Sequence, residues 1–282
     1  MKKKICMILV AVFVAVLGTS TFFIINHYKE ANKQAELYGE LAELVDAAAQ
    51  TNAATEPLEQ IPYSEEKMLL PELAELYQQN GDLVGWISIT DTNINYPVMQ
   101  SVNEPNFYLK HGFDKEYSDY GCPYVQEDCD VQEPSDNLVI YGHHMSNGSM
   151  FAHLEKFKNK DFWSEHRMIT FNILTDKQEY EIVAVFRTVV YTDSPEAFKF
   201  YRFIDAESAN EFDDFIAKSK ELSFYDTGVT AEYGDKLITL STCEYSRNNS
   251  RLVVVAKRIT EDGGADAAKT HAEATAEGER PN

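Results

Sequence analysis

The chain has little positive charge for its length. Its 282 residues include 25 Lys and Arg against 46 Asp and Glu, which gives a formal net charge of −21. Nucleic-acid binding needs a basic surface that neutralises phosphates, and adhesion to anionic lipid needs a polybasic patch. The composition therefore argues against both. The acidity by itself is typical of a solvated surface and identifies no cation site.

Cysteine is also scarce, with 4 residues in the chain. Cys6 falls within an apolar N-terminal run, which leaves Cys122, Cys129 and Cys243 in the rest of the chain. Because three is odd, at least one of these thiols is unpaired unless it bonds another chain. A bridge between Cys122 and Cys129 stays open, since the sequence does not give their Cα separation. Whether or not Cys122 and Cys129 are bridged, Cys243 is the cysteine to examine.

One long apolar run stands at the N-terminus. Residues 5–25 carry no charge, and 21 residues at about 1.5 Å each make roughly 31 Å of helix, enough to cross a bilayer. Three lysines precede the run, and positive charge stays on the cytoplasmic side. We therefore expect a cytoplasmic segment 1–4, a transmembrane signal anchor 5–25 and an outward-facing remainder. A cleaved signal peptide is the competing interpretation, but 16–18 (VLG) is a poor cleavage site.

The rest of the chain divides into a connector, a domain and a tail. Apolar residues recur at helical spacing from 28 to 50, and a segment with Thr, Asn and Pro follows. We interpret 26–63 as an extracellular stalk that lifts the domain off the membrane, with packing of its helix onto the domain as the alternative. The domain covers 64–260. The acidic, Ala- and Glu-rich tail 261–282 has no large apolar residue, so we expect it to be disordered.

Short strand-like runs separated by turn residues fill the domain. A short helix at 70–79 precedes them and ends at Asn80-Gly81, a natural C-terminal stop. Many short strands at such spacing are typical of a β barrel or sandwich. The expected strands are 84–89, 95–100, 137–142, 168–173, 178–191, 236–243 and 251–257.

A helix interrupts these strands at 208–220. Ser208 and Glu211 have the spacing of a capping box, which predicts where the helix begins. Its apolar residues, among them Phe212 and Phe215, gather on one face. We expect this face to pack across the outside or the rim of the barrel.

The strand-like run KLITLSTC ends on Cys243, where a side chain can be reached from solvent. Seven residues rich in turn formers lead from it to Arg251, at the start of the next strand. If the two strands pair as a hairpin, Cys243 and Arg251 face one another roughly 4.5–8 Å apart. A nucleophilic cysteine needs access and a group that stabilises its thiolate or accepts its proton. The permanently charged guanidinium can hold a substrate carbonyl as negative charge develops on it.

Two adjacent histidines, His143 and His144, follow another strand-like run and a glycine. His143 can accept the thiol proton if the barrel brings both strand ends to one rim. A metal site, with His153 as a further ligand, is the rival interpretation. Zinc takes three or four ligands from separated positions, and neighbouring residues on a strand point to opposite sides. We therefore expect no metal at this pair.

These motifs resemble those of the sortases, the cysteine transpeptidases of Gram-positive bacterial surfaces. TLSTC (239–243), followed by an arginine eight residues on, fits the TLxTC signature, and YGHHM (141–145) places a histidine directly after a strand-end glycine. The resemblance extends over about 64–260. The segments 84–100, 106–114 and 137–151 are similar to class B sortases, and the helix at 208–220 fits a feature that marks that class.

The resemblance implies a mostly β (α+β) fold: a closed eight-stranded sortase-type β barrel with N-terminal helices and a helix inserted between strands six and seven. It implies catalytic roles for His143, Cys243 and Arg251, and no cofactor or metal. Ser241 and Thr242 flank the cysteine and are candidates for substrate binding, with strand packing as the alternative.

The resemblance also implies partners. Cys243 would attack the threonine carbonyl in a C-terminal sorting motif of a secreted protein, of the Asn-Pro-x-Thr type or related. A peptidoglycan amine of the lipid II type would then resolve the thioester, while the N-terminal helix holds the enzyme in the cytoplasmic membrane. A pilin-polymerising sortase and a non-catalytic surface binding protein on the same scaffold are the alternatives.

Two positions near the motifs receive no catalytic role. Glu244 stands where many class B members have Asp, so it is assigned none. The family histidine directly follows the glycine, which selects His143. His144 is then expected on the opposite side, as a bystander or as a modest aid in orienting the loop.

Overall fold

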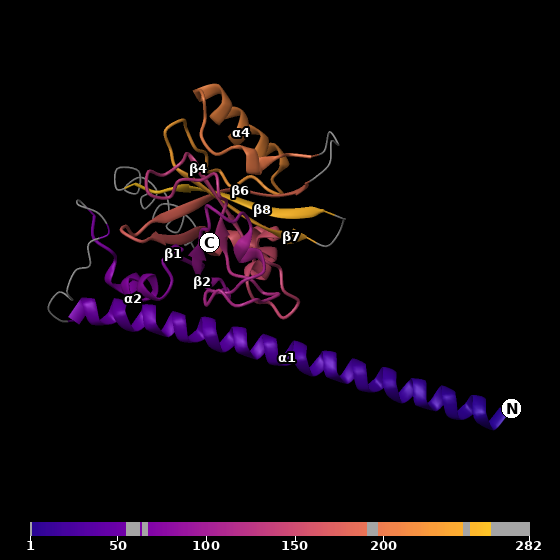
Figure 1. Cartoon of the computed structure of the whole chain (residues 1–282). Helices are drawn as coiled ribbons and strands as arrows, with labels where there is room; N and C mark the ends of the chain where they lie inside the picture. Colours follow the sequence, from indigo (N-terminus) through magenta and orange to yellow (C-terminus); the bar gives the residue numbers. More distant parts are fainter. Residues whose placement is uncertain (1, 55–62, 64–66, 191–196, 245–248, 261–282) are drawn as a thin grey trace, which may run out of the picture.

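A computed structural model describes residues 2–54, 63, 67–190, 197–244 and 249–260. The predicted tail 261–282 lies outside the described residues. Eight strands close into a barrel in the order β1-β2-β3-β4-β7-β8-β6-β5, so the barrel that the resemblance implies is confirmed (Figure 1). The strands are β1 (Leu83–Ser88), β2 (Asn95–Met99), β3 (Tyr124–Val125), β4 (Asn137–Tyr141), β5 (Met168–Ile173), β6 (Glu179–Val189), β7 (Leu237–Glu244) and β8 (Ser250–Arg258).

Seven of these strands lie within two residues of the predicted ranges. The exception is β3, whose two residues are too few to show any periodicity in the sequence. It pairs in parallel with β2 through Met99 and Tyr124, and antiparallel with β4. This short strand therefore joins β2 to β4, two strands that the sequence pattern does predict, and so closes the barrel.

The core fills the barrel and extends to its outer face. Helix α4 (Ala209–Leu222) packs against β6, and the 3-10 helix η2 (Phe151–Lys158) packs against β6, β7 and β8. Strands covered on both faces become continuous apolar runs instead of alternating ones. This explains the sequence Leu-Val-Val-Val-Ala at 252–256, in which every residue is fully buried. The remaining short helices are α2 (Pro71–Gln79), η1 (Phe107–Leu109), α3 (Lys160–Glu165) and η3 (Phe200–Arg202).

Helix α4 lies on the outside of the barrel between β6 and β7 in chain order, as predicted (Figure 1). The Ser208 hydroxyl accepts a hydrogen bond from the Glu211 backbone N–H at 3.4 Å, which caps the helix. The Glu211 carboxylate accepts from the N–H of Glu207, one residue before the cap. Phe212 and Phe215 are buried beneath the helix, so its apolar face supplies the packing.

Helix α1 (Lys2–Ala54) continues without a break from the apolar run into the predicted connector. It contains a span from Lys4 to Gln50 with a mean hydropathy of 2.6 in its most apolar window. By length and composition, it is the one helix in the described part of the chain that is able to cross a membrane. Figure 1 shows this helix extending well past the barrel toward its N-terminus.

The C-terminal half of α1 packs against the barrel. Tyr38 and Leu41 are buried, and the Tyr38 hydroxyl donates to the carbonyl of Gly121 at 2.7 Å. The Tyr38 ring also meets Tyr96 of β2 edge to face, with 5.4 Å between the centroids. Of the two alternatives for this helix, packing onto the domain is therefore the one observed for 31–45, instead of a stalk that stands clear of it.

Cys122 and Cys129 are free thiols, so the bridge left open by the sequence is not formed. Each is buried in its own surroundings. The Cys122 sulfur lies 3.5 Å from the carbonyl oxygen of Pro97, and the Cys129 sulfur lies 3.5 Å from that of Asn137. Burial raises the pKa of both thiols, that of Cys129 to about 12.

Candidate active site

The site is built on three adjacent strands, with β7 in the middle. β4 and β7 are parallel and in register, with Tyr141 beside Ser241. Two residues further along each strand direction stand His143 and Cys243. On the other side of β7, Cys243 pairs directly with Arg251 of β8. The topology therefore brings His143, Cys243 and Arg251 to one level at the rim, with the cysteine between the two others.

Gly142 allows the backbone to leave the end of β4 and present His143 at the rim. Its N–H donates to the carbonyl of Ser241 at 3.1 Å, and the Phe151 N–H donates to the carbonyl of His143 at 2.8 Å. A Cβ at position 142 would lie 2.5 Å from the ring of Phe151, closer than side-chain atoms pack. The glycine thus lets Phe151 pack directly beneath the backbone that presents His143.

All five predicted site residues line one groove of about 360 Å³. Cys243 and Arg251 are half-buried there, and an Arg251 Nη1 hydrogen bond to the carbonyl of Ser250, 3.0 Å long, holds the guanidinium near the strand start. Paired residues on neighbouring strands have Cβ atoms about 4.5–5.5 Å apart. Cys243 and the permanently charged Arg251 are therefore neighbours at the groove, where a guanidinium can stabilise an oxyanion formed next to the sulfur.

The imidazole of His143 is held by a backbone carbonyl. Its Nε2 lies 2.7 Å from the oxygen of Leu109. A carbonyl only accepts, so Nε2 carries the proton and Nδ1 of the neutral ring is the nitrogen that can accept one. Burial, aided by the positive charges of Lys110 and Arg251, lowers the pKa of His143, and the Leu109 hydrogen bond and Asp119 oppose that shift. The ring is therefore neutral near pH 7 and can act as a base.

His144 diverges from His143, as the strand geometry predicts, but it is not isolated from the site. Its Nδ1 lies 3.0 Å from the carbonyl oxygen of Cys243 and 3.9 Å from a carboxylate oxygen of Glu155. His153 accepts a hydrogen bond from the backbone of Asn93 instead. The three histidines do not converge, and no group in the described part of the chain has the His, Cys, Asp and Glu arrangement of a metal site.

The sequence did not single out the aromatic wall of the groove. Tyr124, Tyr141 and Ser241 are paired across β3, β4 and β7, so their side chains share one face. The Tyr141 hydroxyl donates to the Gln126 side chain at 2.6 Å, and Gln126 donates to the carbonyl of Tyr201 at 3.1 Å. The two-residue β3 is too short to give a periodic signal for Tyr124. Tyr141, two residues before His143, belongs to the YGHHM motif and could have been named from it.

Two hydroxyls beside the cysteine have no hydrogen-bond partner among the described residues. Ser241 is 1% exposed and Thr242 is 2% exposed, and both line the groove. A buried hydroxyl without a partner costs about 1–3 kcal/mol. Both hydroxyls therefore remain candidates for hydrogen bonds to a molecule bound in the groove.

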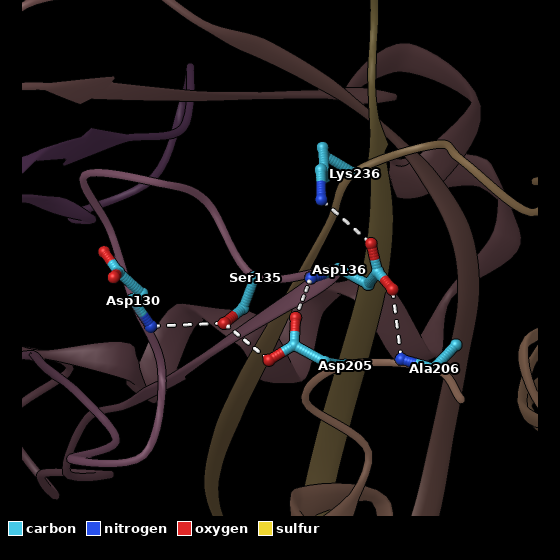
Figure 2. A network of polar contacts seen from close by, with 6 residues as sticks. All are labelled: Asp130, Ser135, Asp136, Asp205, Ala206 and Lys236. Atoms are coloured by element: carbon cyan, nitrogen blue, oxygen red, sulfur yellow. Dashed lines mark hydrogen bonds and ion pairs between the residues drawn. The ribbon is translucent and has the colours of Figure 1, made fainter.

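A polar network fixes the connection between β3 and β4 (Figure 2). The Ser135 hydroxyl donates to Asp205 at 3.1 Å and accepts from the Asp130 N–H at 3.2 Å. The Asp136 carboxylate accepts from Lys236 at 2.8 Å and from the Ala206 N–H at 3.0 Å. The network thus joins the β3–β4 connection to the segment before β7 and to the connection between β6 and β7.

Comparisons with known proteins agree on one family. A model of the sortase domain matches residues 87–259. Sortase B of Listeria monocytogenes is 35% identical over 193 residues, which cover 67% of this chain and 74% of that protein. Sortase B of Staphylococcus aureus is 30% identical over 191 residues, 67% of this chain and 75% of that protein.

Solved structures give the same likeness. A Staphylococcus aureus sortase B–substrate complex superposes with a TM-score of 0.70 at 26% identity, over 83% of this chain and 99% of that one. Sortase B from B. anthracis in complex with AAEK1 superposes with a TM-score of 0.67 at 28% identity, over 83% and 100% of the two chains.

Proposed function

This chain belongs to the sortase family of cysteine transpeptidases, in class B, and from that premise we propose that it joins secreted proteins to the cell wall. The proposed donor is a protein with a C-terminal sorting motif, cleaved after threonine. The proposed acceptor is a peptidoglycan amine of the lipid II type. The observation that carries the proposal is the strand register, which brings His143, Cys243 and Arg251 side by side at the ends of three adjacent strands.

In the first step, Nδ1 of His143 accepts the proton of the Cys243 thiol, and the thiolate attacks the threonine carbonyl. The Arg251 guanidinium stabilises the negative charge that develops on the carbonyl oxygen. The amide C–N bond then breaks, and the departing nitrogen takes the proton from the His143 imidazolium. A thioester between Cys243 and the threonine remains.

In the second step, an acceptor amine attacks the thioester and gives its proton to His143. The C–S bond breaks, and the sulfur of Cys243 leaves as a thiolate beside Arg251. The product is a new amide between the threonine and the acceptor. Return of the proton from His143 to the sulfur restores the free enzyme, so the cycle needs no metal or redox partner.

Ser241 and Thr242 are proposed contacts for the donor peptide. Their unpartnered, buried hydroxyls line the same groove as the cysteine and can bond the peptide's polar groups. Substrate binding and strand packing differ in their consequences. Ser241→Ala should raise the KM for a sorting-motif peptide if the hydroxyl binds substrate, whereas packing alone predicts only a change in stability.

Membrane attachment is proposed through the N-terminal part of α1. The segment 5–25 lies beyond the barrel, its described side chains are exposed, and three lysines precede it. Apolar side chains exposed along a whole helix are stable in lipid and costly in water. The lysines then favour a single-pass orientation with the catalytic domain on the cell-wall side.

The test is transfer of a sorting-motif peptide of the Asn-Pro-x-Thr type to an amine by the full-length chain. Cys243→Ala should abolish transfer and leave the circular dichroism spectrum unchanged. Unchanged transfer by this variant would contradict the proposal. Absence of transfer by the wild-type chain across a peptide library would instead favour a non-catalytic surface protein on the same scaffold.

A further inference from the structure

A tight turn carries two acidic residues at the edge of the groove. Glu127 and Asp128 occupy its tip, between Gln126 and Cys129, and the Cys129 N–H donates to the carbonyl of Gln126 at 3.1 Å. The Gln100 side chain donates to both flanking carbonyls, at 3.0 Å to Gln126 and 2.7 Å to Cys129. We name residues 126–129 the acidic turn.

The acidic turn is held rigidly from behind. Its Gln126 backbone N–H donates to the carbonyl of Val139 on β4, and its side chain joins Tyr141 to Tyr201. The network in Figure 2 begins directly after the turn, at the Asp130 N–H. The two carboxylates are therefore presented on a fixed backbone, and little conformational entropy is lost when a ligand binds them.

The acidic turn separates two hollows. Glu127 and Asp128 line the groove that contains Cys243, and they also line a neighbouring cavity of about 470 Å³. Gln126 lies opposite Val139, four residues before His143 on the strand that leads to it. At about 3.3 Å per residue this places the turn roughly 13 Å from the catalytic level, or about four residues of an extended peptide.

The carboxylates of the turn are not paired with any of the residues that the structure describes. In the part of the chain that the structure describes, neither Glu127 nor Asp128 has an ion pair or a hydrogen-bond partner. Among the described residues that line the same groove, Arg251 is the other charged group with a fixed sign, paired with the cysteine. The described lining of the groove is thus positive at its catalytic end and negative at the turn.

Other groups in the groove also point to a bound peptide. The Ser241 hydroxyl is 1% exposed and has no partner among the described residues. The rings of Tyr124 and Tyr141, 5.4 Å apart, line the stretch between this hydroxyl and the acidic turn. An aromatic wall that leads to a carboxylate suits the long apolar stem and the charged head of lysine or arginine.

We propose that Glu127 and Asp128 are specificity residues that select a cationic side chain on the donor peptide, about four residues from the reacting carbonyl. The inference rests on the proposed function and deepens it, because it names a feature of the donor. The pair makes an ionic contact with the lysine or arginine while the carbonyl lies against Cys243. Recruitment of the acceptor amine by the same carboxylates is the competing use of the turn.

The test is a scan of one charged residue along the donor, with the full-length chain in detergent. Peptides of the Asn-Pro-x-Thr type carry a single lysine, norleucine or glutamate at x or at one of the flanking positions up to six residues from the threonine. At a position about four residues from the threonine, lysine should exceed glutamate in kcat/KM by about three- to tenfold at low ionic strength, through KM, and a preference confined to x would contradict the inference. The preference should shrink in high salt.

Variants of the turn show whether its charges cause the preference. Glu127→Gln with Asp128→Asn should abolish it, and Glu127→Lys with Asp128→Lys should reverse it toward glutamate. The matched control is Glu133→Gln, which changes an exposed acid of the same connection that does not line the groove and should leave the preference unchanged. Thermal melting checks that the turn variants fold.

Binding separates this inference from the proposed function. Fluorescence anisotropy of the same peptides with full-length Cys243→Ala measures the preference without turnover. Tighter binding of the lysine peptide supports the inference even if the wild-type chain transfers nothing, a result that would overturn the proposed function alone. Equal binding of the lysine and glutamate peptides, or a turn variant that alters only the KM for the amine, overturns the inference.

Discussion

The Nδ1 atom of His144 lies 3.0 Å from the carbonyl oxygen of Cys243. Since that oxygen only accepts, Nδ1 carries a proton, and the imidazole pins the backbone at the end of β7. His143, next to it in the sequence, instead bonds the carbonyl of Leu109 and faces the groove. The two adjacent histidines therefore hold different parts of the site, one as the proposed base and one behind the nucleophile.

The first prediction is that replacing the two histidines lowers transfer activity to different extents. His143→Ala removes the base and should abolish transfer, whereas His144→Ala removes one hydrogen bond and should lower kcat about two- to tenfold. His144→Asn should recover part of this loss, because its side-chain amide can donate to the same carbonyl. Steady-state kinetics of the three variants checks this, and equal loss at both positions would contradict the assignment.

The second prediction concerns the reactivity of the thiols. Burial raises the pKa of Cys129 to about 12 and that of Cys122 as well, so both are protonated at pH 7.5. Cys243 is half-buried in the groove beside a guanidinium. The thiolate is the form that reacts, and a buried, protonated thiol offers little of it. Iodoacetamide should therefore modify Cys243 first.

Peptide mapping by mass spectrometry reads this order of modification in the folded chain. A Cys6→Ala background removes the thiol of the apolar run from the comparison. Denaturation is the control, because unfolding exposes all remaining thiols and should make their rates similar. If Cys122 or Cys129 reacts as fast as Cys243 in the folded chain, the proposed activation of Cys243 is wrong.

The third prediction is the position of the acidic limb of the pH profile. Burial lowers the pKa of His143, so its neutral, proton-accepting form persists below the usual value of about 6.5. The acidic limb of kcat/KM should therefore have its midpoint below about pH 6.5. Asp119 raises the pKa of His143, so Asp119→Asn should move the midpoint further toward acid. A midpoint above 6.5, or a shift toward base in this variant, would contradict the prediction.

Sequence patterns anticipated the parts of the site that lie on long strands. The run of apolar residues before Cys243 and the turn formers after it predicted a hairpin, and the direct pairing of Cys243 with Arg251 confirms it. Parallel pairing of β4 with β7, which brings His143 to the same level, depends on contacts about 100 residues apart. Spacing along the chain does not specify such a pairing, so only the family resemblance pointed to it.

Other features escaped the sequence for local reasons. Tyr124 lies on a two-residue strand, which is too short for a period of two to appear. The acidic turn is set by the Gln100 side chain, which bonds carbonyls 26 and 29 residues away. The helix that continues from the apolar run packs through Tyr38 and Leu41, but an amphipathic pattern does not state which surface it will cover.

The last prediction compares two lysine–carboxylate pairs of equal length. Lys236 bonds Asp136 at 2.8 Å, and Asp136, 17% exposed, also accepts from the Ala206 N–H. Lys218 bonds Glu221 at 2.8 Å on the surface of α4, where the two side chains are 43% and 67% exposed. Lys236→Met leaves the half-buried Asp136 carboxylate without its charged partner and should lower the free energy of unfolding by about 1.5–3 kcal/mol.

Lys218→Met should cost at most about 0.5 kcal/mol, because an exposed pair three residues apart on a helix contributes little. Urea unfolding at equal pH and salt gives both values. Since the Lys236 network also holds the connection that carries the acidic turn (Figure 2), Lys236→Met should raise the KM for the donor peptide, whereas Lys218→Met should not. Equal stabilities for the two variants would mean that the network contributes no more than a surface pair. An unchanged KM in Lys236→Met would mean that the turn keeps its place without it.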